Sequence, residues 1–289
     1  MCVSGTTEHG HGSAGGRTVE KVEVDGMDRR AFLKSGAALA AGGALAAMGP
    51  AMPAVATHRR RKRVYDLTYR LTTDFPDFYG TEPVIVDRVD NDFDTVGFYS
   101  KSWTFPEHIG THMDAPGHFG QGAWNVDELP ADLLIAPLVV VDITRKADED
   151  PNAMLEPADL VAYERRHGRM PEGALVAMNS GWQSRFGDGD TFRGGDGFPD
   201  LNFPGFSIEA TDWLVAKRDP VGIGVDTMSI DPGNSADFAV HFGFLPTNRY
   251  GIENLANLDA VPAKGTTAYV GAVPWEDGSG GPCRVLAVR

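Results

Sequence analysis

The residues from His108 to His118 constrain this chain more than any other stretch, because they hold three histidines and an aspartate within eleven positions. His108, His112, Asp114 and His118 are separated by four, two and four positions. Since side chains alternate along an extended backbone, even spacing directs all four to one face. In a helix, Asp114 would lie roughly 240° around the axis from His108, and Pro116 would interrupt the helix. The spacing therefore predicts a strand or turn that gathers these four groups.

Imidazole nitrogens and carboxylate oxygens are the ligands that zinc and manganese use in proteins. A single histidine is more commonly a surface residue or a hydrogen-bonded core residue. Four ligand-type groups with matched spacing favour a metal site instead. Five histidines follow position 58, and His167 alone among them lies outside the site proposed below.

The string H-x-G-T-H-x-D-x-P-x-H resembles the hallmark of the cyclase family of metal-dependent hydrolases, which includes bacterial kynurenine formamidases and isatin hydrolase. A second resemblance is a histidine followed twelve residues later by an acid, here His241 and Glu253. Residues 65–68 and 221–233 also resemble family stretches. The resemblance thus covers residues 64–289.

The resemblance implies a site that holds one or two divalent ions, Zn²⁺ or Mn²⁺, beside a histidine that transfers protons. The implied residues are His108, His112 and Asp114 for one ion, Asp114, His241 and Glu253 for a second ion, and His118 as the catalytic proton carrier. In relatives with a glutamine at the position of Glu253, a single ion suffices. Glu253 keeps the two-ion option open here.

The resemblance also implies an α/β fold of the swivelling β/β/α type, with a mixed curled sheet or barrel, outer helices, and assembly into homodimers or homotetramers. The expected activity is hydrolysis of an amide, formamide or cyclic amide of a small-molecule substrate, in the manner of an arylformamidase or isatin hydrolase. Two alternatives remain open. The same site could serve a cyclase or lactone hydrolase, or the chain could be a non-catalytic exported metal-binding protein.

The N-terminal region resembles a twin-arginine export signal. Arg29 and Arg30 precede an apolar stretch rich in Ala and Gly at 35–48, and Ala54-Val55-Ala56 offers a cleavage site. A buried helix or a membrane anchor is the alternative, but the stretch is shorter than the ~20 residues of a spanning helix. We therefore expect residues 1–56 to be a tail and signal, and residues 57–289 to be one hydrolase domain. The implied partner is the twin-arginine translocase, and the implied location is periplasmic or extracellular.

Charge and cysteine content narrow the partners and the covalent chemistry. The net charge of -14 disfavours nucleic acid or an anionic membrane as partner. The basic run at 58–63 is interpreted as a solvated mature N-terminus rather than a lipid- or nucleic-acid-binding arm. Loss of Cys2 with the signal would leave Cys283 alone, which excludes an intramolecular disulfide.

Apolar runs of strand length predict strands at 64–68, 138–143, 174–178 and 221–225. Helices are predicted at 156–166 and 207–217, the second with Ser207 as N-cap. The stretch 186–205, rich in Gly, Asp and Pro, predicts an irregular surface loop. This order of elements indicates a mixed α/β fold.

Several weaker candidates for the functional site each have a functional and a structural interpretation. Asp226 and Asp231 would either orient ligand histidines or cap the turns that follow a strand. Four aromatic residues would either line a substrate pocket or pack in the core, and they are Phe75, Phe78, Tyr79 and Trp182. Gly110 and Gly117 would either let the backbone approach a metal or simply form turns.

Overall fold

The computed structural model describes residues 62–81 and 84–289. The predicted twin-arginine signal, its cleavage site and the boundary after residue 56 lie outside the described residues. All described residues fall within one compact unit of the chain. Among them, no helix is both long and apolar enough to cross a membrane.

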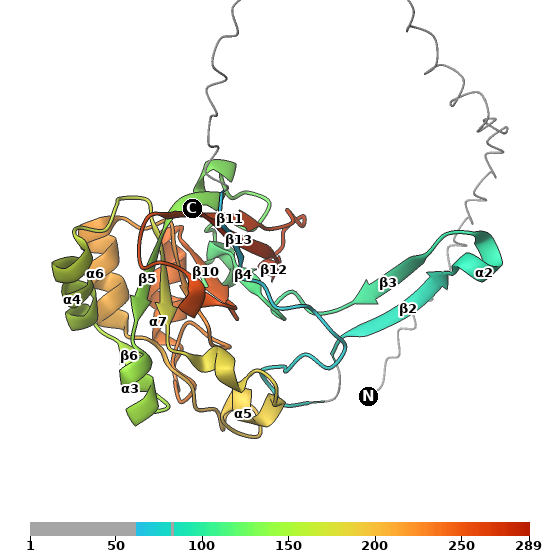
Figure 1. The fold of residues 1–289 in the computed structure, drawn as a ribbon, viewed down its shortest axis with the longest axis horizontal. Coiled ribbons are helices and arrows are strands. Elements are labelled where there is room, and N and C mark those ends of the chain that lie inside the picture. The colour runs from blue at the N-terminus through green and yellow to red at the C-terminus, as the bar shows by residue number, and fades with distance from the viewer. Residues whose placement is uncertain (1–61, 82–83) are drawn as a thin grey trace, which may run out of the picture. The chain divides into compact units, whose positions relative to one another are not determined.

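A nine-stranded mixed sheet forms the centre of the fold and is strongly curled (Figure 1). Its four middle strands run parallel to one another, and the outer pairs are antiparallel. In spatial order the strands are β1 (Val64–Asp66), β13 (Arg284–Val288), β11 (Thr266–Gly271), β5 (Ile135–Asp142), β7 (Leu175–Asn179), β9 (Gly222–Val225), β10 (Tyr250–Glu253), β4 (His112–Asp114) and β12 (Gly280–Pro282). The predicted α/β class with a mixed curled sheet and outer helices is confirmed.

Strand β5 shows why the central strands have continuous apolar sequences. Leu138 and Val140 pack into a core on one face of the sheet, whereas Val139 and Val141 pack into a second core on the opposite face. The second core includes Leu160 and residues of other helices. Because both faces are covered, the strand needs no polar side chain between its apolar ones.

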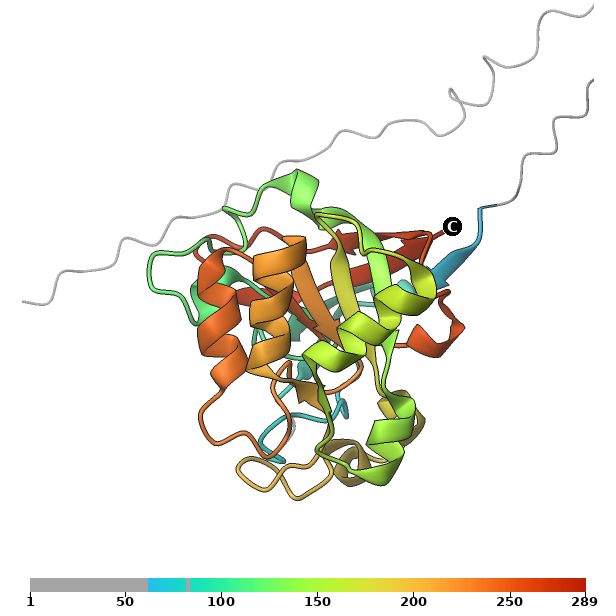
Figure 2. The ribbon, with the colours of Figure 1, turned by 90° about the vertical axis from the view of Figure 1, so that its left-hand side faces the viewer.

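Two eleven-residue helices, α4 (Pro157–His167) and α6 (Ile208–Arg218), lie side by side over one face of the sheet (Figure 2). The predicted N-cap is confirmed, since the Ser207 hydroxyl accepts a hydrogen bond from the backbone N–H of Ala210. Both helices are displaced by one residue from the predicted bounds. The shorter elements are α3 (Thr144–Glu149), α5 (Gly189–Arg193), α7 (Ala239–Phe244), the strand pair β6 (Met154–Leu155) and β8 (Gly205–Phe206), and five 3-10 helices, η1 (Pro116–His118), η2 (Ala131–Leu134), η3 (Trp182–Arg185), η4 (Leu245–Thr247) and η5 (Leu258–Ala260).

Three predicted elements need correction. Strand β5 begins at Ile135, three residues before the predicted start and ahead of Pro137. A proline is tolerated here because this end of β5 pairs only with β11, and pairing with β7 starts at Leu138. The stretch 186–205 is not wholly irregular, since it contains α5. The first strand ends at Asp66, and Thr68 beyond it forms an isolated bridge to Leu255.

A separate antiparallel hairpin consists of β2 (Val86–Asn91) and β3 (Ser100–Thr104), joined through α2 (Phe93–Val96). It extends away from the nine-stranded sheet (Figure 1) and has no buried residue. The predicted elements do not include it. The sequence of β2, V-D-R-V-D-N, lacks the strict alternation of a half-buried strand and resembles a loop as much as a strand.

Candidate metal centre

Strands β4 and β10 place three of the predicted ligands together. In their antiparallel pairing His112 lies opposite Glu253, and Asp114 lies two residues from His112 on the same face of β4. The Nε2 atom of His112 is 3.3 Å from Asp114 Oδ1 and 3.3 Å from Glu253 Oε2. All three side chains are buried, so the sheet itself builds this part of the site.

His108 and His118 reach the same place through turns on either side of β4. Gly110 has φ +71°, a left-handed conformation that ends extended backbone after His108. Pro116 starts the 3-10 turn η1, which carries His118. The two imidazole rings stack with their centroids 3.8 Å apart. The prediction of a strand or turn is thus confirmed, although the segment is not one continuous strand.

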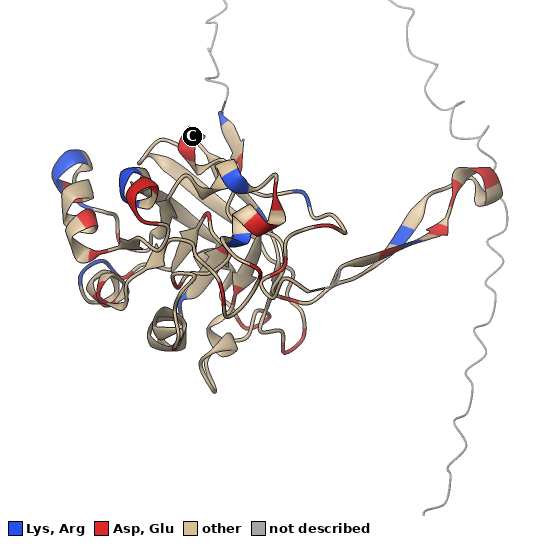
Figure 3. Ribbon diagram, turned by 90° about the horizontal axis from the view of Figure 1, so that it is seen from below, with Lys and Arg blue, Asp and Glu red and all other residues tan. Residues whose placement is uncertain are grey.

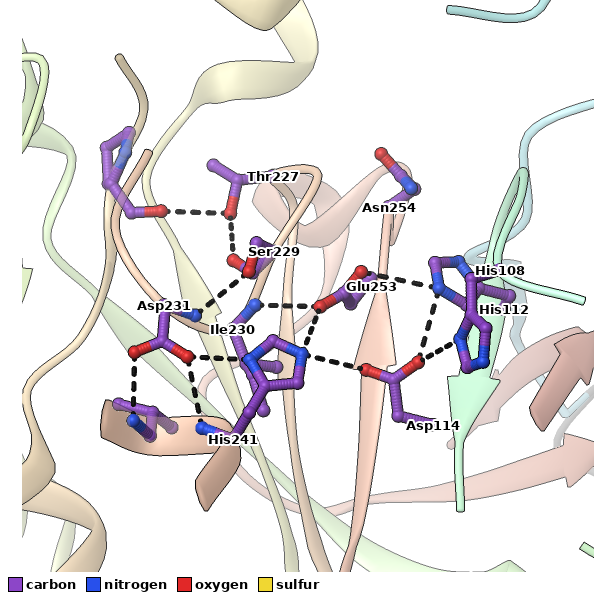
Figure 4. Close-up of polar contacts among 12 residues, drawn as sticks. His108, His112, Asp114, Thr227, Ser229, Ile230, Asp231, His241, Glu253 and Asn254 are labelled. Atoms are coloured by element: carbon purple, nitrogen blue, oxygen red, sulfur yellow. Dashed lines mark hydrogen bonds and ion pairs between the residues drawn. The ribbon is translucent and has the colours of Figure 1, made fainter. Parts of the chain in front are cut away.

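His241 comes from α7 and completes the group. Its Nε2 atom lies 3.5 Å from Asp114 Oδ2 and 3.5 Å from Glu253 Oε1 (Figure 4). Asp114 and Glu253 therefore lie between His112 on one side and His241 on the other.

All six predicted residues line one cavity of about 280 Å³. This volume is close to the lower end of the ~300–1,000 Å³ typical of small-molecule sites. The rest of the wall is largely apolar and aromatic, with Phe78, Phe119, Met228 and Phe238 among its residues. Such a cavity suits a small organic substrate held beside polar groups.

Known proteins are similar to this chain in sequence and in fold. A family model described as "Putative cyclase" matches residues 65–232. The chain belongs to the cyclase family. It is 34% identical over 224 residues to isatin hydrolase from Roseibium aggregatum, with 74% of this chain and 84% of that protein covered. It is 27% identical over 158 residues to kynurenine formamidase from Salinibacter ruber, with 54% and 65% covered.

Solved structures of relatives have the same fold. An isatin hydrolase bound to the product analogue thioisatinate superposes with a TM-score of 0.74 at 29% identity, covering 79% of this chain and 92% of that one. Isatin hydrolase A from Ralstonia solanacearum gives a TM-score of 0.74 at 32% identity, covering 84% and 99%.

The hydrogen-bonding chemistry of this cavity fits a bound cation. His112 Nε2 and Asp114 Oδ2 are buried, and neither has a hydrogen-bond partner among the described residues. His108 Nδ1 is 2.7 Å from Asp114 Oδ1, while His108 Nε2 is 2.9 Å from the Ser279 hydroxyl, which donates to Glu107. If that hydroxyl accepts the His108 Nε2–H, a proton or metal ion must lie between Nδ1 and the Asp114 oxygen. The donor set fits a divalent ion.

The carboxylates also set the charge on the neighbouring imidazoles. Burial alone would lower the pKa of His112, but the carboxylates of Asp114 and Glu253, each 3.3 Å from its Nε2 atom, raise that pKa to about 10. The pKa of His241 is raised well above its usual value against the same effect of burial, through Asp114, Asp231 and Glu253. Burial alone would raise the pKa of Asp114, but the surrounding His108, His112 and His241 hold it well below its usual range.

His118 has the opposite shift, because burial lowers its pKa to about 4. It is therefore neutral at pH 7 and able to accept a proton. Its ligand atom also lies within 4.8 Å of those of His108 and Asp114, so geometry alone permits it to bind a metal as well.

Three polar groups hold the candidate ligands in place. Asp231 accepts from the backbone N–H groups of Val240 and His241 and from His241 Nδ1, at 2.8, 3.0 and 2.6 Å. It thus both caps α7 and orients a histidine. The carbonyl of Gly110 accepts from His112 Nδ1 at 2.9 Å, so Nε2 of that ring faces the carboxylates. The third is the Ser279–Glu107 pair at His108, which was not predicted, because Ser279 lies 171 positions from His108.

The structure assigns each of the other weak candidates to one of its two interpretations. Asp226 accepts from Ser180 and Trp182, which makes it a turn cap rather than a partner of a ligand histidine. Phe78 and Tyr79 line the cavity, whereas Phe75 and Trp182 are buried in core clusters. Cys283 is buried, and burial raises its pKa to about 12, so it is not a nucleophile at neutral pH.

Proposed function

We propose that this cyclase-family chain hydrolyses an amide, formamide or cyclic amide, in the manner of an arylformamidase or isatin hydrolase, using a bound divalent metal. The observation that carries the proposal is the convergence of six ligand-type side chains in one cavity, with buried nitrogen and oxygen atoms that lack a partner. Relatives named isatin hydrolase and kynurenine formamidase, both of which act on C–N bonds, support the reaction class.

The proposed ligands are His108, His112 and Asp114 for one ion, with Asp114 shared with a second ion held by His241 and Glu253. Zn²⁺ and Mn²⁺ both suit this set of imidazole and carboxylate donors. When bound, such an ion lowers the pKa of a coordinated water from 15.7 toward ~7 and polarises the substrate carbonyl. Two buried carboxylates would balance the charge of one ion, and the histidines would complete its coordination.

His118 is the proposed proton carrier. Neutral at pH 7, it accepts a proton from the attacking water through a ring nitrogen. The resulting imidazolium lies beside the carboxylate of Asp114, which stabilises the positive charge. It then donates this proton to the leaving nitrogen as the C–N bond breaks, so the ring returns to its starting state.

The cavity wall favours an aromatic substrate. Phe119 and Phe238 lie on one side with ring centroids 6.1 Å apart, and Phe78 lies 6.4 Å from Phe238. Phe238 has φ +51°, a conformation costly for a bulky residue, and in it the ring lies against the cavity. Planar rings pack well against such walls in offset or edge-to-face arrangements. We infer an aryl amide or aryl lactam as the substrate class.

Export and assembly complete the proposal. The arginine pair at 29–30 and the apolar stretch after it support passage through the twin-arginine translocase to the periplasm or the medium. Replacing both arginines with lysine should then keep the protein in the cytoplasm, as measured by cell fractionation. An unchanged distribution would reject this route.

We also propose a homodimer or homotetramer as the working form.

The reaction class is tested by product analysis on three matched aryl substrates: an N-formyl aryl amine, a fused aryl lactam and the corresponding lactone. We expect release of formate from the first substrate, ring opening of the second, and slower reaction of the third relative to its spontaneous rate. Preference for the lactone, or ring closure of the open product, would favour the cyclase or lactone hydrolase alternative. Metal binding without any turnover would favour a binding protein.

A further inference from the structure

Asn254 is a cavity residue that the proposed metal chemistry does not use. It follows Glu253 at the end of β10, is 3% exposed and lines the cavity beside the candidate ligands (Figure 4). Its backbone is held on both sides, since its N–H donates to the Thr227 carbonyl at 2.8 Å and its carbonyl accepts from the Thr111 hydroxyl at 2.6 Å. Its φ of +56° is one that asparagine, aspartate and glycine tolerate better than other residues. The side chain therefore has a fixed place in the cavity wall.

Hydrogen bonding determines which end of the Asn254 amide faces the neighbouring backbone. The Gly110 carbonyl lies 2.9 Å from this side-chain amide and also accepts from His112 Nδ1 at 2.9 Å. A carbonyl can only accept, so the Asn254 atom beside it is the Nδ2 donor. The other end of the amide is Oδ1, which is buried and has no hydrogen-bond partner among the described residues. Because a buried oxygen without a donor is unfavourable, this atom suits a partner that arrives with a bound molecule.

The cavity wall offers no cationic side chain as that partner. No Lys or Arg is among the described residues that line the cavity. Basic residues lie instead in the last turns of α3, α4 and α6, and Figure 3 shows basic positions on the outer helices and along the hairpin of β2 and β3. An amide substrate carries a suitable donor in its own N–H group.

We propose that Asn254 is a specificity-determining residue whose Oδ1 atom accepts a hydrogen bond from the N–H of the substrate amide. The inference rests on the hydrolase function proposed above and narrows its substrates to secondary amides and lactams with a free N–H. A lactone places a ring oxygen at the same point, so two acceptors face each other without a donor. An N-methyl lactam places a methyl group there. A site built around a buried polar group rejects a ligand that leaves this group unpaired.

This hydrogen bond is compatible with the whole reaction. The oxygen of water bonds to the carbonyl carbon, the C–N bond breaks, and its electron pair remains on the nitrogen. The nitrogen takes the proton carried by His118 and keeps the hydrogen that Asn254 accepts. Because one N–H is held by the protein, the orientation of the nitrogen is fixed while its second hydrogen arrives.

Two variants separate this role from a purely structural one. Asn254→Gly tolerates the positive φ but removes both the Nδ2 donor and the Oδ1 acceptor. Asn254→Asp keeps an acceptor oxygen and loses only the donor to Gly110. The matched control is Asn257→Gly. Asn257 also has φ +56° and donates from Nδ2 to a backbone carbonyl, that of Asp66, at 2.8 Å, but it is exposed and does not line the cavity.

The measurement is kcat/KM of the metal-loaded full chain for a fused aryl lactam, its N-methyl derivative and the corresponding lactone, with metal content counted in every variant. Dividing the lactam value by each of the others gives two selectivity ratios. Comparing each ratio between wild type and variant cancels the intrinsic reactivity of the substrates. We expect both ratios to fall at least ~10-fold in Asn254→Gly, to be retained in Asn254→Asp and to be unchanged in Asn257→Gly.

Ratios in Asn254→Gly equal to those of wild type, with the lactam still hydrolysed, would overturn this proposal and leave the hydrolase function standing. Equal kcat/KM of the wild type for the lactam and its N-methyl derivative would also overturn it, and this outcome does not depend on the folding of any variant. Loss of both ratios in Asn254→Asp as well would assign the effect to the hydrogen bond with Gly110 and reject the role of Oδ1. Failure of the wild type to hydrolyse any amide would instead overturn the proposed function on which the inference rests.

Discussion

His241 Nδ1 lies 2.6 Å from Asp231 Oδ2, and this contact joins the cap of α7 to the candidate metal centre. The carboxylate accepts the Nδ1–H, so the Nε2 atom of the ring faces Asp114 and Glu253. Asp231 is 2% exposed and follows β9 in a turn. A residue in this position controls both the orientation and the basicity of a metal-binding imidazole.

Replacing Asp231 with Asn should weaken binding of the ion that we propose at His241. An amide leaves one of the three N–H donors without an acceptor and removes the negative charge behind the imidazole, so we expect affinity for that ion to fall ~10–100-fold. Isothermal titration with Zn²⁺ or Mn²⁺, with metal content counted after dialysis, measures this. Retention of both affinities would remove Asp231 from the account.

The matched control is Asp226→Asn. Asp226 is also fully buried and also accepts three hydrogen bonds, but it touches no candidate ligand. Its replacement should cost ~1–3 kcal/mol of stability while leaving metal affinity unchanged. Equal loss of metal in both variants would mean that general destabilisation, not orientation of His241, causes the effect.

Metal binding should release protons. The pKa of His112 is raised from 6.5 to about 10 by its carboxylate neighbours, so the metal-free protein carries a proton there at pH 7. In the metal-free protein this proton contributes stability that is fully present below pH ~6.5 and is lost as pH rises through about 10. Because the metal needs the neutral imidazole, apparent affinity should increase with pH up to about 10.

The measurement is titration calorimetry at pH 7 in two buffers of different ionisation enthalpy. We expect release of one proton from His112 and a second from His241, whose pKa is also raised. Identical heats in the two buffers would contradict the charge state assigned to these residues.

Replacing His118 with Ala should separate its two possible roles. As the proton carrier it contributes ~10²–10⁴-fold to the rate, so kcat should fall by that factor while metal content stays unchanged. His118→Gln should behave alike, since glutamine cannot carry a proton. Loss of metal together with activity would instead make His118 a ligand, as its position near His108 and Asp114 permits.

Removing the metal should destabilise the folded protein, because the ion binds the assembled site and not the unfolded chain. An ion present at 100 times its dissociation constant adds ~2.7 kcal/mol. For a domain of this size that corresponds to a fall in Tm of roughly 5–10 °C on chelation. Differential scanning calorimetry with and without a chelator measures it, and an unchanged Tm would mean that no ion occupies the cavity.

Much of the fold was predictable because its central strands and two main helices carry strong local signals. The runs at 138–143 and 174–178 are apolar throughout because both sheet faces are covered. Three-residue strands such as β4 and β12 are too short to show any period, and pairing with distant segments alone makes them strands. The hairpin of β2 and β3 was missed for a related reason, since none of its residues is buried in a core that would shape its sequence.

The site residues, too, differ in how far the sequence could predict them. Even spacing within one short segment predicted that His112 and Asp114 share a face, and this is borne out by β4. The approach of His241 and Glu253 followed from family resemblance, because no local pattern links α7 and β10 to β4. Ser279 and Glu107 had no usable signal. Only the pairing of β12 with β4 brings Ser279 to His108.

Metal-dependent turnover of a matched aryl amide is the most direct test of the central claim. The purified protein would be assayed on an N-formyl aryl amine and a fused aryl lactam as isolated, after chelation, and after return of Zn²⁺ or Mn²⁺. The account predicts hydrolysis of at least one of them that disappears with the metal and returns with it. Full activity in metal-free protein, or no hydrolysis of either amide by metal-loaded protein, would contradict it.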